Sequence, residues 1–183
     1  MNTAYYLHCF ASLNCARHKG KEAPHKPVLL LALADLAEQG RLKGTETAPD
    51  AALETAFRQV WRRYVADVGF TMNMGMPFYH MRSEPFWHLS IGRWSGGDIE
   101  DRHKIKNLGT LRRVAARATI NAGLIDCLNS ITEWEKLRAL LIERYFNRRN
   151  GGTDRHGPGR QDVPSTVSNL PSPQNGPQYC AAA

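Results

Sequence analysis

Two residues near the start of the chain could bind an anion together. The tripeptide HKP places His25 and Lys26 directly before Pro27, where a helix is predicted to begin. Free N–H groups and the positive end of the helix dipole attract anions there, and a lysine adds a counter-charge. The arrangement is typical of a phosphate-binding site. The alternative is an ordinary exposed lysine before a proline in the first helical turn, and the motif alone favours that alternative.

The segment GMPFYHMRSEPFWHLS, residues 75–90, concentrates aromatic, methionine, histidine and proline side chains. Its alternating pattern predicts a β-hairpin that turns at RSEP. His80 and His88 are a weak metal signal, because no carboxylate or thiol stands at ligand spacing. A rim of aromatic and proline carbons could also serve recognition, for example by stacking on unpaired bases. The rings expected in the core of the sheet are Phe78, Phe86 and Trp87.

A basic run favours a polyanionic partner. Six Lys or Arg residues and no acid lie between positions 102 and 117, and the whole chain carries 24 Lys and Arg against 17 Asp and Glu, a net charge of +7. Several cations on one face could each neutralise a phosphate, whereas a solvated helix face would explain some of them equally well. The basic balance favours nucleic acid. The side chains predicted to contact it are Arg82, Arg102, His103, Lys104, Lys106, Arg112 and Arg113.

The sequence lacks a recognisable catalytic or metal-binding cluster. The acids nearest one another are predicted to lie around turns as solvated loop residues, without the pairing that water activation needs. Neither a Gly-rich phosphate loop nor a nucleophile elbow is present. We therefore predict a protein that is not an enzyme, with no cofactor and no metal. The acids concerned are Glu84, Asp98, Glu100 and Asp101.

Cysteine usage and hydropathy indicate a cytoplasmic protein. The four cysteines are scattered without a C-x-x-C pair, which favours reduced thiols over a zinc site or a disulfide framework. No stretch approaches the ~20 consecutive apolar residues of a spanning helix, and the N-terminal segment does not have the pattern of a secretion signal. A membrane partner is therefore not expected.

Helical patterns dominate the chain that must position these residues. Apolar spacing predicts one helix within 2–17, and a second from Pro27 to Gly40 that is apolar on nearly every side. A third is predicted to begin after Asp50 as its N-cap, with an apolar face and arginines largely off that face. The segments 108–120 and 121–146 are also helical in character, with a short strand at RATI.

These elements predict an α+β fold, a mainly helical single domain with a small antiparallel hairpin or sheet, winged-helix-like. The domain is expected to span residues 1–150. Residues 151–183 are rich in Gly, Pro, Ser, Asn and Gln, which predicts a disordered linker or tail.

The order of four segments resembles a known family. HKPVLLLALADL, FRQVWRRYV, MPFYHMRSEPFWHL and LRALLIERYF together resemble the sulfur-binding domain of phosphorothioate-dependent type IV restriction endonucleases (McrA-type, HNH class). The likeness spans residues 5 to 147. It implies a module that binds double-stranded DNA in which sulfur replaces one non-bridging phosphate oxygen. It also implies a separate nuclease domain or partner that cuts, within a restriction system.

The resemblance implies a sulfur pocket. In the family a basic residue near the HKP-like segment lines it, together with a Tyr-Pro pair and a small residue three positions after the proline. The matching positions here are His25, Lys26 and Pro77. Met76 stands where the tyrosine is expected, and His80 stands where the small residue is expected.

Three other functions are compatible with the sequence. A regulator that reads unmodified DNA would bind sulfur and oxygen duplexes alike, and a nuclease with an unrecognised site would cut DNA in Mg²⁺ or Mn²⁺. A protein-interaction adaptor that uses segment 75–90 would bind almost no DNA. The loop EDRHKIKN, residues 100–107, is the candidate reader of the bases around the modified link.

Overall fold

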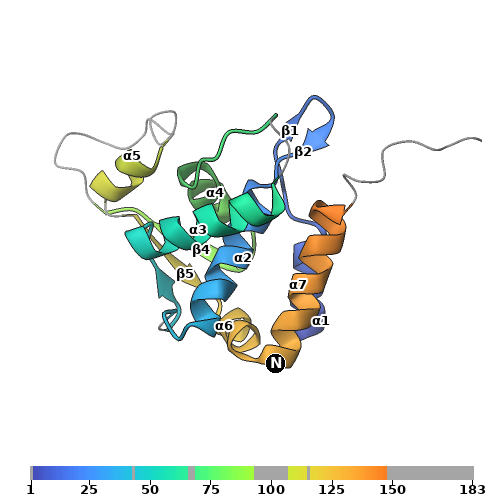
Figure 1. The fold of residues 1–183 in the computed structure, drawn as a ribbon. Coiled ribbons are helices and arrows are strands. Elements are labelled where there is room, and N and C mark those ends of the chain that lie inside the picture. Colours follow the sequence, from blue (N-terminus) through green and yellow to red (C-terminus); the bar gives the residue numbers. More distant parts are fainter. Residues whose placement is uncertain (1, 43, 66–68, 93–106, 115, 148–183) are drawn as a thin grey trace, which may run out of the picture. The chain divides into compact units, whose positions relative to one another are not determined.

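A central helix, α2 (His25–Glu38), organises the fold. The computed structural model describes residues 2–42, 44–65, 69–92, 107–114 and 116–147. From Lys26 to Ala37 every residue of α2 except Asp35 is buried, as its apolar pattern on all sides predicts. The helix packs against α3, α4, α6 and α7, whose bounds are given below (Figure 1). It begins two residues before the predicted start, with Pro27 inside its first turn.

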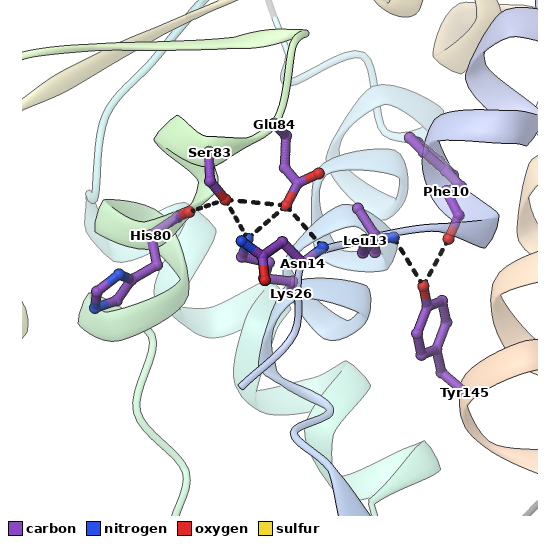
Figure 2. Close-up of polar contacts among 8 residues, drawn as sticks. All are labelled: Phe10, Leu13, Asn14, Lys26, His80, Ser83, Glu84 and Tyr145. Atoms are coloured by element: carbon purple, nitrogen blue, oxygen red, sulfur yellow. Dashed lines mark hydrogen bonds and ion pairs between the residues drawn. The ribbon is translucent and has the colours of Figure 1, made fainter. Parts of the chain in front are cut away.

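Three helices complete the packing around α2. α1 (Thr3–Ala11) lies within the segment predicted to be helical and packs against α6 (Ala122–Asn129) and α7 (Ile131–Tyr145). The helical pattern of 121–146 is interrupted at Ser130, whose backbone is extended. At the far end of α7 the Tyr145 hydroxyl donates to the Phe10 carbonyl at 2.8 Å and accepts from the Leu13 amide at 3.2 Å (Figure 2). This contact fastens α7 to the chain that leaves α1.

Helix α3 (Ala51–Tyr64) confirms the prediction made for it. The Asp50 side chain accepts a hydrogen bond from the Leu53 amide at 2.8 Å, which caps the helix. The apolar residues Leu53, Phe57, Val60 and Trp61 are buried, whereas Arg58, Arg62 and Arg63 are exposed.

The predicted hairpin over 75–90 is wrong in its first half. Residues Gly75–His80 form helix α4, and Met81–Ser83 continue it as a 3-10 turn, η1. The Asn73 side chain accepts from the Gly75 amide at 2.9 Å, and Pro77 lies in the first turn, where its missing N–H costs nothing. Phe78, Tyr79 and Met81 are buried. The mixture of large apolar and polar residues in this segment resembles the alternation of a strand. The three buried positions nevertheless also suit one face of a helix.

The strand in the second half of that segment pairs elsewhere. β4 (Trp87–Ser90) lies antiparallel to β5 (Arg117–Ile120), the predicted RATI strand, with Trp87 opposite Ile120 and Ser90 opposite Arg117. β3 (Glu46–Thr47) pairs with the other edge of β5, giving the order β3-β5-β4. A separate two-stranded sheet joins β1 (Arg17–His18) and β2 (Lys21–Glu22). The fold is α+β, as predicted.

Helix α5 (Leu108–Arg113) is joined tightly to α4. A β-carbon added at Gly75 would lie 2.6 Å from the Leu108 amide nitrogen and 2.7 Å from the Asn107 carbonyl carbon, so only glycine fits. The start of α5 is held by the Asn107 side chain, which accepts from the Thr110 amide at 2.9 Å. The two helices therefore meet backbone to backbone.

All these elements belong to one of two units, Met1–Gly152. The second, Thr153–Ala183, lies outside the described residues, and with it the predicted tail. None of the described helices is long and apolar enough to cross a membrane.

Candidate ligand-binding pocket

A pocket of about 730 Å³ opens where four segments meet. Its lining comes from residues 14–18, from the start of α2, from residues 69–73, and from α4 with η1. These segments lie far apart in the sequence, and α2 and α4 are in direct contact. The pocket brings together six residues that the sequence predicted to bind a ligand: His25, Lys26, Met76, Pro77, His80 and Arg82.

One wall of the pocket is apolar. The lining includes four apolar residues, Phe70, Met72, Met76 and Pro77, which are together called the apolar wall. Met72 and Met76 are 41% and 36% exposed, which is unusual for side chains that are normally buried. Since methionine is flexible and polarisable, such a wall adapts to a large, soft atom. No acidic residue lines the pocket among the described residues.

Lys26, which lines the pocket, forms a buried ion pair with Glu84 (Figure 2). The Lys26 ammonium donates to Glu84 Oε1 at 2.5 Å and to Ser83 Oγ at 2.8 Å. The same Glu84 oxygen accepts from the Asn14 amide at 3.1 Å, and Ser83 Oγ donates to the His80 carbonyl at 3.0 Å. Lys26 and Glu84 are each 6% exposed. One carboxylate thus joins the chain after α1, the start of α2 and the end of η1.

This pair corrects two expectations. Lys26 is not an exposed lysine, and Glu84 is not a solvated loop acid. Each residue looks solvent-exposed when its own segment is considered alone. The two partners lie 58 residues apart in the sequence, so no local pattern pairs them. A charge leaves water only when a partner compensates it, so each residue makes the burial of the other possible. Lys26 therefore adds little net charge to the pocket.

His25 holds a wall of the pocket in place. Its Nε2–H donates to the Thr71 carbonyl at 2.9 Å, and its ring centre lies 4.8 Å from that of Trp61. Burial lowers the pKa of His25, which keeps the ring neutral near pH 7. The ring thereby fixes residues 69–73 against α2 and α3.

One cation of the pocket, Arg82, lies in η1, directly after α4. Arg82 Nη1 donates to the Tyr79 hydroxyl at 2.6 Å, and its guanidinium carbon lies 4.1 Å from the centre of that ring. Burial lowers the pKa of His80, and the charges of Arg82 and Lys26 lower it further. Neutral His80 and charged Arg82 both line the pocket.

The basic run predicted to contact nucleic acid is only partly described. Arg102, His103, Lys104 and Lys106 lie outside the described residues. Arg112 and Arg113 are exposed on α5 but do not line the pocket.

Arg112 instead makes internal contacts. Its Nε donates to the Pro49 carbonyl at 2.7 Å, and its Nη2 donates to Glu54 at 2.9 Å. It borders a second pocket of about 300 Å³. Arg113 Nη2 donates to the Thr110 hydroxyl at 3.3 Å.

Sequence reasoning missed the lining from residues 14–18 and 69–73. The second segment belongs to FTMNMGMP, where three methionines recur at every second position, which is a signal of a soft surface. Both segments carry little or no regular secondary structure, so periodicity could not place them.

The described residues contain no group of three or more His, Cys, Asp and Glu arranged to hold a metal. The His88 ring donates to the Asn121 side chain at 3.0 Å. Cys15 borders the pocket, and burial raises the pKa of its thiol to about 12, so it stays protonated.

The chain has the fold of a sulfur-binding domain, as comparison with solved structures shows. One is the sulfur-binding domain of SprMcrA complexed with phosphorothioated DNA, with a TM-score of 0.58 and 18% identity over 79% of this chain and 86% of that one. Another is the sulfur-binding domain of ScoMcrA complexed with phosphorothioated DNA, with a TM-score of 0.55 and 22% identity over 80% of this chain and 90% of that one. No model of a protein family and no curated protein matches the chain.

Proposed function

We propose that this domain binds double-stranded DNA carrying a phosphorothioate, with the sulfur against the apolar wall of the pocket. The observation that supports the proposal is the composition of that pocket within this fold. Met76, Pro77 and Arg82 line the same pocket, and no described lining residue is acidic. An anion with one poorly hydrated face suits such a site.

Selectivity would come from a penalty on oxygen. Sulfur is larger than oxygen and accepts hydrogen bonds poorly, so it loses little hydration against methylene and thioether carbons. A phosphate oxygen in the same place would lose its water without replacement, at a cost of about 1–3 kcal/mol. This corresponds to a preference of about 10- to 100-fold.

The remaining negative charge of the modified phosphate needs a cation. The sequence suggested Lys26 and Arg82 for this role, but the carboxylate of Glu84 already offsets Lys26. We therefore assign the charge contact to Arg82, which Tyr79 holds in position. An arginine restrained in this way loses little side-chain entropy when it binds a phosphate.

The proposed role includes no chemical step. The domain would read the modification within a restriction system, and a nuclease domain or partner, joined through residues 151–183, would cut. Purified protein incubated with modified plasmid and Mg²⁺ or Mn²⁺ should produce no cuts. Specific cleavage would show that the domain is an enzyme.

The decisive experiment compares two duplexes that differ in one atom. Each phosphorothioate diastereomer and its oxygen counterpart are titrated at equal salt, because affinity for DNA depends strongly on salt. One diastereomer should bind at least ten times more tightly than the oxygen duplex. Equal affinities would remove the sulfur function and leave a reader of unmodified DNA, whereas no binding to either duplex would favour a protein-interaction adaptor.

A variant of the apolar wall links the preference to the pocket. Met76→Gln keeps the length of the side chain but offers the phosphate oxygen a hydrogen-bond donor, so the preference for sulfur should fall several-fold. Ile131→Gln is the matched control, because Ile131 is 76% exposed on α7 and does not line the pocket. An unchanged preference in Met76→Gln would contradict this placement of the sulfur.

A further inference from the structure

The hairpin of β1 and β2 carries a lysine that its turn does not favour. Arg17 pairs with Glu22 and His18 with Lys21, so Lys19 and Gly20 form a two-residue turn. Figure 1 shows the hairpin under the labels β1 and β2. Their φ angles are 50° and 79°, as in the type I′ turn.

This turn prefers Asn and Gly, since other residues in the left-handed conformation cost about 1–2 kcal/mol. Gly20 meets the requirement, whereas Lys19 bears the cost. Backbone geometry therefore does not explain a lysine at the tip.

The hairpin is strongly basic. Residues 17–22 include three Lys or Arg residues and one acid, Glu22. Glu22 accepts two hydrogen bonds from Arg144, at 2.7 and 3.2 Å, and one from Arg17 at 3.4 Å. The Arg144 contact lowers the pKa of Glu22, so the carboxylate stays ionised and Arg144 offsets its charge. With Arg144 counted, four cations face one carboxylate, which leaves a net charge of +3.

The hairpin stands at the rim of the pocket. Arg17 and His18 line the pocket, and the His18 ring centre lies 6.2 Å from that of Phe70 on the apolar wall. At the base, the Ala23 amide donates to the Ala16 carbonyl at 2.7 Å. Lys19 is exposed and makes no ion pair or side-chain hydrogen bond within the described part of the chain.

We infer that the β1–β2 hairpin is a second contact surface for DNA, binding backbone phosphates that flank the one in the pocket. The inference rests on the proposed function and adds a surface to it. Contacts to unmodified phosphates carry no information about sulfur or sequence, so the hairpin supplies affinity and orientation. The conformational cost of the left-handed backbone at Lys19 is offset when the lysine ammonium contacts a phosphate.

The test removes the charge and keeps the turn. Lys19→Asn creates the Asn-Gly pair that a type I′ turn favours most, so the hairpin should be at least as stable, with an unchanged or higher Tm. Lys136→Gln is the control: Lys136 is exposed on α7, more than two helical turns before Arg144, and its ion pair is a surface contact with Glu133 in the same helix. Both variants and the wild type are titrated with the sulfur and oxygen duplexes at several salt concentrations.

Lys19→Asn should weaken both duplexes by the same several-fold factor at ~0.1 M salt. It should also reduce the slope of log affinity against log salt by about 0.9, the value for one phosphate contact. Lys136→Gln should leave the slope unchanged. A slope equal to that of the wild type in Lys19→Asn would overturn the inference, as would a loss confined to the sulfur duplex.

The two proposals fail in different ways. If the wild type binds both duplexes equally, the sulfur function is lost, but the slope measured with Lys19→Asn still decides the role of the hairpin. If the wild type binds neither duplex, both proposals are wrong.

Discussion

Removing the charge of Glu84 should destabilise the domain far more than an ordinary substitution. Glu84→Gln keeps the size of the side chain and an oxygen that can accept from Asn14, but leaves the Lys26 ammonium without a counter-charge. The two side chains are 7% and 5% exposed, so water cannot replace the lost partner. A buried ion pair broken on one side costs about 3–5 kcal/mol.

This loss can be measured by urea unfolding, followed by tryptophan fluorescence. With a slope of about 2 kcal/mol per molar urea, the midpoint should fall by about 2 M. Glu143→Gln on α7 is the matched control, because Glu143 is exposed, and its effect should stay within about 0.5 kcal/mol.

A double variant separates the charge from the packing. Lys26→Met replaces the lysine with an unbranched chain of similar length, so Lys26→Met combined with Glu84→Gln contains no unpaired charge. It should recover most of the stability lost in Glu84→Gln, giving strongly non-additive effects. A loss below 1 kcal/mol in Glu84→Gln, or a double variant no more stable than the single one, would refute the reasoning.

Three further outcomes follow from the structure. Burial and neighbouring cations lower the pKa of His80 below its ordinary value near 6.5. A bound phosphate should raise this pKa, so binding takes up protons and affinity should increase as the pH falls. An equal pH dependence in His80→Gln would exclude His80 as the group that titrates. Gly75→Ala should lower the midpoint of thermal unfolding by several degrees, since the new methyl group meets the backbone of residues 107–108; an unchanged midpoint would show that α5 can move away. Replacing residues 93–106 with a Gly/Ser linker of equal length should preserve the fold and the preference for sulfur, because both neighbours are anchored, Gly92 to the Val114 carbonyl and Asn107 as the cap of α5. These residues include all of the candidate base-reading loop EDRHKIKN except Asn107, so base preference should be lost, as titration of duplexes with different flanking sequences would show.

Local signals in the sequence predicted local structure well. The Asp50 cap, the apolar face of α3 and the RATI strand were correct because each depends on neighbours within a few residues. Segment 75–83 was misassigned because three large buried side chains in four positions suit a strand or one face of a helix.

The pocket was predictable in part. HKP and the MPFYHMR segment carried six of its residues, since both signals are local or come from the family resemblance. The pairing of Lys26 with Glu84 depends on how α2 meets η1, and no spacing in the sequence encodes that meeting. Residues 69–73 were missed for the same reason, because the His25 ring that holds them is 46 residues away from Thr71.

The backbone contact at Gly75 sets a distance. It ties α4, which forms the wall proposed to receive sulfur, to α5, which begins where residues 93–106 end. If the loop EDRHKIKN, which ends at Asn107, reads bases, this contact fixes the number of base pairs between the modified phosphate and the bases that the domain prefers. Such a protein measures a distance along the DNA. Lengthening the loop would change which bases it selects, while the end of the loop at α5 would stay fixed relative to the modified phosphate.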